Sequence, residues 1–118
     1  MKKYQLIIVG GGPGGYTAAF RAAELGMSVA IVDDNDLGGV CLNWGCIPTK
    51  SLLKNAEVFE LISNASSYGI EVGKPKLHFE KIIDKTIQAR KRLSKGLPFQ
   101  VRKLGVDFFP GCATFIAH

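Results

Sequence analysis

Two short hydrophobic runs open the chain and are separated by a segment rich in alanine. The runs at residues 4–9 (YQLIIV) and 28–32 (SVAIV) are rich in β-branched side chains, which predicts two buried strands. Residues 16–25 predict a helix between them, with Gly26 as the residue that ends it. Because both strands are apolar throughout, they indicate a parallel pair covered on both faces.

Apolar residues recur at helical spacing in two later segments. The first of these helices is expected at residues 46–63, after a loop at residues 33–39. The second is expected to begin at Phe79 and to kink or break where Gly96 and Pro98 interrupt the pattern.

The remaining segments predict turns and short strands. Residues 64–76 have turn chemistry with a brief strand at 70–72, and two further strands are expected at 106–109 and 113–117. With 47% hydrophobic and 21% charged residues, the 118-residue chain has the composition of one soluble α/β globular unit.

The net charge of +5 is unevenly distributed along the chain. Residues 74–103 hold ten Lys or Arg against only Glu80 and Asp84. Such a stretch could contact nucleic acid or an acidic partner, or it could be a solvated helix face. No aromatic residue interleaves the charges from residue 80 to 95, as a nucleic-acid surface would require, so we expect no nucleic-acid partner.

No hydrophobic segment predicts contact with a membrane. The longest apolar run near the start, residues 6–9, is far too short to cross a bilayer. No basic segment followed by an apolar one opens the sequence, so we expect no secretory signal and a cytoplasmic location.

Three glycines between the first strand and the first helix form the pattern G-x-G-x-x-G. Gly10 would permit a tight turn, Gly12 would let the backbone approach a diphosphate, and Gly15 would let the helix pack close to the strand. Asp33 stands at the end of the second strand, where an acidic residue can accept hydrogen bonds from a ribose. The pattern therefore predicts a dinucleotide site, but it does not distinguish FAD from NAD.

Two of the three cysteines, Cys41 and Cys46, are separated by only four residues. On a regular helix five steps rise about 7.5 Å, which is too far for a disulfide. A disulfide here would require a distorted turn, which Gly45 and Pro48 would allow.

Three interpretations of this cysteine pair remain open. A thiol near a helix N-terminus has a stabilised thiolate, which favours a redox-active disulfide. The spacing also permits a zinc site completed by Cys112 and His118, although no second paired cluster is present and we expect no metal. The third interpretation is a pair of inert buried thiols.

Residues 37–53, LGGVCLNWGCIPTKSLL, resemble the active-site signature of the pyridine nucleotide–disulfide oxidoreductases that carry the redox disulfide on the FAD domain. Leu42–Asn43 and Ile47–Pro48 are similar to the members that oxidise dihydrolipoamide. Members that reduce glutathione disulfide or mercuric ion more often have Val in place of Leu42 and Ile47. The resemblance covers the whole chain, is densest in residues 5–54, and implies a three-layer, Rossmann-like FAD-binding domain.

The resemblance also implies a role for each residue of the disulfide segment. Cys46 would face the flavin, and Cys41 would be the interchange thiol that reacts with the substrate. Lys50 would lie near the isoalloxazine ring and favour negative charge there.

The other implied contacts hold the rest of the cofactor. Residues 10–15 would bind the FAD diphosphate, and Asp33 would bind the adenosine ribose, where the family usually has the longer Glu. Gly38 and Gly39 would line the flavin, and Ala113 would contact FAD through its backbone. The resemblance thus assigns FAD, not NAD, to the first glycine turn.

By the same resemblance, residues 1–118 are the N-terminal part of an incomplete FAD-binding domain. Family members continue with an NAD-binding domain and a dimer-interface domain that supplies a His–Glu pair. Because the chain has no second G-x-G-x-x-G, we expect a segment with little NAD-dependent turnover of its own. The implied partners are dihydrolipoamide on an acyltransferase lipoyl domain and, in the full-length homodimer, a second copy. A related reductase and a non-catalytic FAD-binding module are the alternatives.

Overall fold

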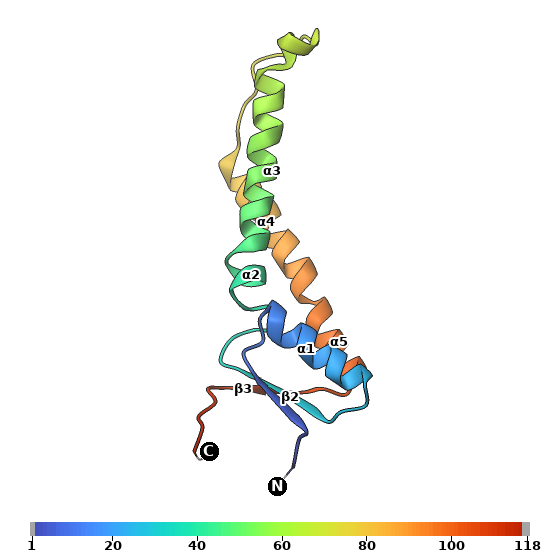
Figure 1. Cartoon of the computed structure of the whole chain (residues 1–118). Helices are drawn as coiled ribbons and strands as arrows, with labels where there is room; N and C mark the ends of the chain where they lie inside the picture. The colour runs from blue at the N-terminus through green and yellow to red at the C-terminus, as the bar shows by residue number, and fades with distance from the viewer. Residues whose placement is uncertain (1, 117–118) are drawn as a thin grey trace.

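A three-stranded parallel sheet forms the base of the molecule in the computed structural model, which describes residues 2–116. The strands lie side by side in the order of the chain (Figure 1): β1 (Leu6–Val9), β2 (Val29–Asp33) and β3 (Asp107–Pro110). Ile31 of the central strand is paired with Ile8 on one side and with Phe108 on the other. The carboxyl ends of all three strands therefore meet at one edge of the sheet.

Two helices, α1 (Pro13–Glu24) and α5 (Gly96–Lys103), cover one face of this sheet. The core lies between them and the sheet, and its fully buried members come from both layers: Ala19, Ala22, Val29, Ile31, Leu37, Val101 and Val106. Alternate residues of β1 point to the opposite face, where Ile7 is 56% and Val9 is 57% exposed. The expectation of a sheet covered on both faces is wrong for the described residues, because their helices pack on one face only.

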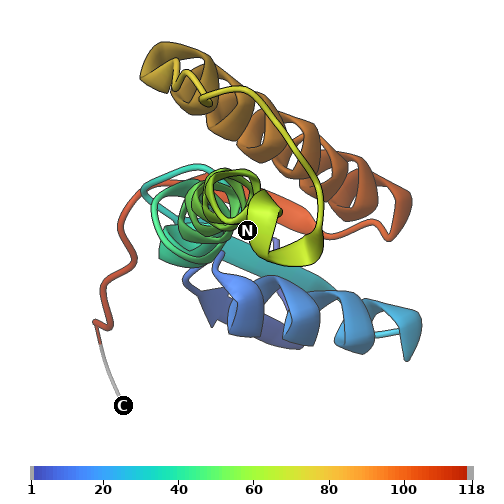
Figure 2. The same ribbon diagram turned by 90° about the horizontal axis from the view of Figure 1, so that it is seen from above.

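An arm of helices projects from the sheet and gives the molecule its elongated shape, with principal extents of 67 × 26 × 22 Å. The arm begins after the short helix α2 (Gly39–Asn43) and consists of three elements: α3 (Cys46–Ser63), the 3₁₀ helix η1 (Ala65–Tyr68) and α4 (Phe79–Ser94). Figure 2 shows α3 nearly end-on, with α4 running obliquely beside it. No residue of α3 is fully buried, although many of its side chains are apolar.

The expected break between the last two helices is confirmed. Helix α4 ends at Ser94 and α5 begins at Gly96. Pro98 lies in the first turn of α5. A proline is tolerated there because the first N–H groups of a helix have no partner within the helix. Among the described residues, no helix is both long and apolar enough to cross a membrane.

Two expected strands do not form. Residues 70–72 have no hydrogen-bonded neighbour strand, and residues 113–116 likewise contain no strand. Residue 117, the last of that expected strand, lies outside the described residues. Local β propensity was not sufficient in either segment, because a strand also requires a partner along its edge.

Candidate functional site

The glycine turn lies between β1 and α1, where each of its three signature glycines meets a different constraint. Gly10 has a φ of 103°, a conformation that side chains disfavour. A Cβ atom on Gly15 would lie 1.8 Å from the carbonyl oxygen of Gly10, so only glycine allows this close packing of helix against strand. A Cβ atom on Gly12 would meet only the Cα atom of Gly39, at 3.9 Å, so this part of the backbone is open to a ligand.

The N-terminus of α1 is capped by the backbone of Gly12 alone, without a side-chain hydrogen bond. The first N–H groups of a helix have no acceptor within the helix and, together with the helix dipole, they attract anions. The open turn and this helix end therefore fit the diphosphate of a dinucleotide.

Asp33, at the end of β2, holds the glycine turn through one carboxylate oxygen and the loop that follows β2 through the other. Oδ2 accepts a hydrogen bond from the N–H of Gly11, and Oδ1 accepts one from the N–H of Asn35 at 2.8 Å. The contact with Gly11 is a role that the sequence pattern did not reveal. The expected contact between Asp33 and a ribose stays a prediction.

Gly38 and Gly39 join the disulfide segment to the glycine turn. Both have positive φ values, 114° and 57°. The N–H of Gly38 donates to the carbonyl oxygen of Gly11 at 2.8 Å, and a Cβ atom on Gly39 would lie 2.7 Å from the Cα atom of Gly12. Close packing of the two backbones thus requires glycine at Gly39.

The disulfide between Cys41 and Cys46 is present, and it spans a break between two helices. Cys41 lies in α2, Cys46 is the first residue of α3, and the Cα atoms of the two cysteines are 4.6 Å apart. A Cβ atom on Gly45 would lie 3.0 Å from the carbonyl oxygen of Val40, so a side chain at the break would be crowded by backbone. The expectation of a distorted turn is confirmed.

The disulfide between Cys41 and Cys46 argues against the interpretation of these cysteines as zinc ligands. Sulfurs joined in a disulfide are not thiolate ligands, and the described residues contain no group of three His, Cys, Asp or Glu placed to hold a metal ion. Cys112 is a free, exposed thiol whose sulfur lies 3.7 Å from a carboxylate oxygen of Asp34. His118, the fourth candidate ligand, lies outside the described residues.

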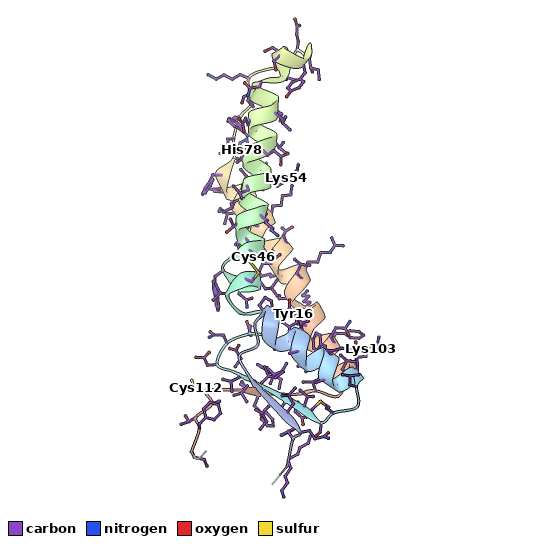
Figure 3. The ribbon with its side chains drawn as sticks, in the orientation of Figure 1. Tyr16, Cys46, Lys54, His78, Lys103 and Cys112 are labelled. Carbon is purple, nitrogen blue, oxygen red and sulfur yellow. A yellow bond between two sulfur atoms is a disulfide. The ribbon has the colours of Figure 1, made fainter. Side chains whose placement is uncertain are left out.

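The two sulfur-bearing side chains differ in exposure, which bears on their chemistry. Cys46 lies at the base of the arm (Figure 3). Its side chain is exposed, whereas that of Cys41 is half-buried. As the first residue of α3, Cys46 lies where the helix dipole stabilises a thiolate. Lys50 lies one helical turn further along α3 with an exposed ammonium group, and its expected place beside the flavin stays a prediction.

A cavity of about 250 Å³ opens at the carboxyl ends of the strands. Its lining brings together segments that are far apart in the sequence: Val9, Gly10, Val32, Asp33, Asp34, Gly111, Cys112 and Ala113. Ala113 therefore lies beside Gly10 and Asp33, although the sequence separates them by 80 residues or more. Ligands of open α/β sheets bind at this edge, so the cavity fits one end of a dinucleotide.

Comparison with known proteins agrees with this geometry. A family model described as pyridine nucleotide-disulphide oxidoreductase matches residues 4–118. A dihydrolipoyl dehydrogenase of Zymomonas mobilis is 49% identical over 108 residues, which are 92% of this chain and 23% of the relative. One of Acholeplasma laidlawii is 44% identical over 111 residues, or 93% of this chain and 33% of the relative. One of Bacillus subtilis is 41% identical over 115 residues, or 96% of this chain and 25% of the relative.

The chain thus spans 23% to 33% of the length of these curated relatives. The matched part contains both the glycine turn and the disulfide. These two features together make up the candidate site.

Proposed function

Because the chain belongs to the pyridine nucleotide-disulphide oxidoreductase family, we propose that it is the FAD-binding, disulfide-carrying segment of a dihydrolipoyl dehydrogenase. The observation that carries the proposal is the disulfide at the broken turn between α2 and α3, on a loop packed against the glycine turn. Relatives that are 39–49% identical have that name, and this supports the choice within the family.

The disulfide would react with a dithiol substrate by two exchange steps. A substrate thiolate attacks the sulfur of Cys41, a mixed disulfide forms, and Cys46 leaves as a thiolate. The second substrate thiol then attacks the mixed disulfide and releases Cys41. The substrate becomes a cyclic disulfide, and the two cysteines carry its two electrons.

The residues that would hold FAD are those whose geometry fits a dinucleotide. The diphosphate would rest on the glycine turn and the N-terminus of α1, and Asp33 and Ala113 would border the adenosine end. FAD, when bound, would supply the two-electron and hydride chemistry that reoxidises the pair of cysteines. Cys46 would face the flavin, Gly38 and Gly39 would line it, and Lys50 would favour negative charge on the ring.

The activity of a whole enzyme requires parts found in its longer relatives. We propose that NAD⁺ is the final acceptor and that it binds to a further domain. The substrate would be dihydrolipoamide on the lipoyl domain of an acyltransferase in a 2-oxo acid dehydrogenase complex. The complete enzyme would be a cytoplasmic homodimer.

Reconstitution with FAD tests this proposal. Mild reduction of the FAD-bound chain with a dithiol should produce a long-wavelength absorption band from a thiolate lying against the flavin. Cys46→Ser should abolish the band, because it removes that thiolate. Cys112→Ser is the matched control, since it removes a free thiol and leaves the disulfide intact.

Three outcomes would contradict the proposal. A band that persists unchanged in Cys46→Ser would refute the assignment of Cys46. A chain that binds FAD without any dithiol-dependent band would be a non-catalytic flavin-binding module. An extended protein that turns over glutathione disulfide or mercuric ion faster than dihydrolipoamide would belong to another branch of the family.

A further inference from the structure

Four cations form a stripe along the solvent side of α4, away from the disulfide. The basic stripe is defined by Lys81, Lys85, Arg92 and Lys95, which are separated by four, seven and three residues and therefore lie on one side of the helix. All four side chains are exposed. The opposite side of α4 packs on α3, where Thr86 is buried.

One carboxylate, that of Asp84, lies three residues after Lys81 on this side of α4, but it forms no ion pair with the stripe. None of the ten Lys and Arg side chains of residues 74–103 lies within ion-pair distance of a described carboxylate. Lys81 and Lys85 are four residues apart, and like charges at this spacing destabilise a helix. A polyanion that binds here would relieve that repulsion.

A mostly apolar cavity of about 410 Å³ lies at the foot of the stripe. Leu37, Pro98, Val101 and Phe108 supply apolar surface. Lys95 belongs both to the stripe and to the lining of this cavity. The cavity could therefore take a bulky apolar side chain next to a row of cations. Arg102 adds a second cation to its lining and Asp36 adds one carboxylate, so cations outnumber carboxylates there by two to one.

We propose that the basic stripe and this cavity bind an acidic protein segment that carries one bulky apolar residue. The fourteen helical steps from Lys81 to Lys95 rise about 21 Å, the length of about six extended residues. Charge complementarity would give the encounter its rate and orientation, and the apolar residue would anchor the segment. Nucleic acid would meet the cations, but its phosphates would leave the apolar cavity unused.

The test uses a fluorescein-labelled peptide of about six glutamates that ends in one phenylalanine. Fluorescence anisotropy should show binding to the chain that weakens about tenfold between about 50 and 500 mM salt. Replacing the phenylalanine with serine should weaken binding about tenfold, because burial of an apolar side chain is lost. This peptide-side change needs no variant of the protein.

A pair of charge-matched variants shows where the peptide binds. Lys81→Gln/Lys85→Gln/Arg92→Gln should weaken binding about tenfold, and Lys3→Gln/Arg21→Gln/Lys54→Gln, with the same net charge, should change it less than about twofold. Equal losses in the two variants, or no effect of the terminal phenylalanine, would overturn the proposal. Tighter binding of a single-stranded oligonucleotide of equal charge would also overturn it, in favour of a nucleic-acid surface.

Discussion

At the scale of single residues, the site is determined by backbones that approach one another where side chains would collide. Gly15 lies against Gly10, and Gly39 lies against Gly12. The G-x-G-x-x-G pattern predicted the first contact, because each glycine in it has a known steric task. The second contact joins two loops 27 residues apart, so it depends on the fold and no local pattern could predict it.

Gly15→Ala should destabilise the chain severely. Its new Cβ atom would lie 1.8 Å from the carbonyl oxygen of Gly10, so α1 must move away from β1. We expect the free energy of unfolding to fall by about 3 kcal/mol or more, measured by urea denaturation. Gly14→Ala is the control, because its Cβ atom would meet nothing within 4 Å. Equal losses in the two variants would contradict the steric explanation.

Asp33→Ala should loosen the glycine turn even without a cofactor. The substitution removes the acceptor for the N–H groups of Gly11 and Asn35. We expect a loss of about 1–3 kcal/mol in the free energy of unfolding and weaker binding of FAD in titration calorimetry. Asp84→Ala, which removes an exposed carboxylate on α4, should change neither quantity. Unchanged stability in Asp33→Ala would show that the turn holds its shape unaided.

At the scale of elements, hydrophobic periodicity predicted most of the fold. Strands β1 and β2 and the helices α3 and α4 lie where the pattern placed them, within two residues. Helix α1 begins at Pro13, three residues before the expected start, because proline suits the first turn of a helix. Helix α2 was not predicted, because its five residues are too few for a periodic pattern.

The sequence predicted the parts of the candidate site that are local in the chain, but not the contacts between distant segments. The motifs identified the glycine turn and the cysteine pair, because their residues are close in the sequence. The approach of Ala113 to Gly10 depends on β3 pairing beside β2, which no local signal reports. The resemblance to a known family, and not spacing, placed Ala113 in the site.

The contact between the two arm helices includes one polar pair, and its loss should weaken the arm. The hydroxyl groups of Ser51 in α3 and Thr86 in α4 are hydrogen-bonded at 2.9 Å, and Thr86 is buried. Thr86→Val keeps the shape but leaves the Ser51 hydroxyl without this partner. We expect a loss of about 1–2 kcal/mol on urea unfolding.

A double-mutant cycle separates the hydrogen bond from packing. Ser51→Ala combined with Thr86→Val should cost less than the sum of the two single variants, because no unpaired hydroxyl remains at the contact. Additive losses would show that the hydroxyl groups do not interact in solution.

At the scale of the whole molecule, the sheet has one covered face and one exposed face. Ile7 and Val9 on β1 and Phe109 on β3 present apolar side chains that are about half exposed, although the ring of Tyr4 lies against that of Phe109. The arm adds apolar surface along α3, where Leu53 and Leu61 are exposed. Exposed apolar surface of this kind is an association risk, so stability should be measured at several protein concentrations.

A polar cluster ties the two edge strands together at the opposite end of the sheet from the site. Asp107, at the start of β3, accepts a hydrogen bond from the hydroxyl of Tyr4 at 2.6 Å and pairs with the ammonium of Lys2. The hydrogen bond from Lys2 and then that from Tyr4 lower the pKa of Asp107 below 3.8. The hydrogen bond to Asp107 raises the pKa of Lys2. Burial is the largest cause of the raised pKa of Tyr4, and the hydrogen bond from Tyr4 to Asp107 is the second.

These shifts predict how stability depends on pH. A lowered carboxyl pKa means that the stabilisation by Asp107 is complete above about pH 4 and is lost as the pH falls through its folded-state pKa. The raised pKa values of Lys2 and Tyr4 mean that their contributions are complete below about pH 10 and are lost above it. Asp107→Asn should therefore flatten the fall of the melting temperature below about pH 4, and Asp84→Asn should leave it unchanged. The same acid slope in wild type and Asp107→Asn would show that other carboxylates control acid unfolding, and that the two edge strands are held together without this cluster.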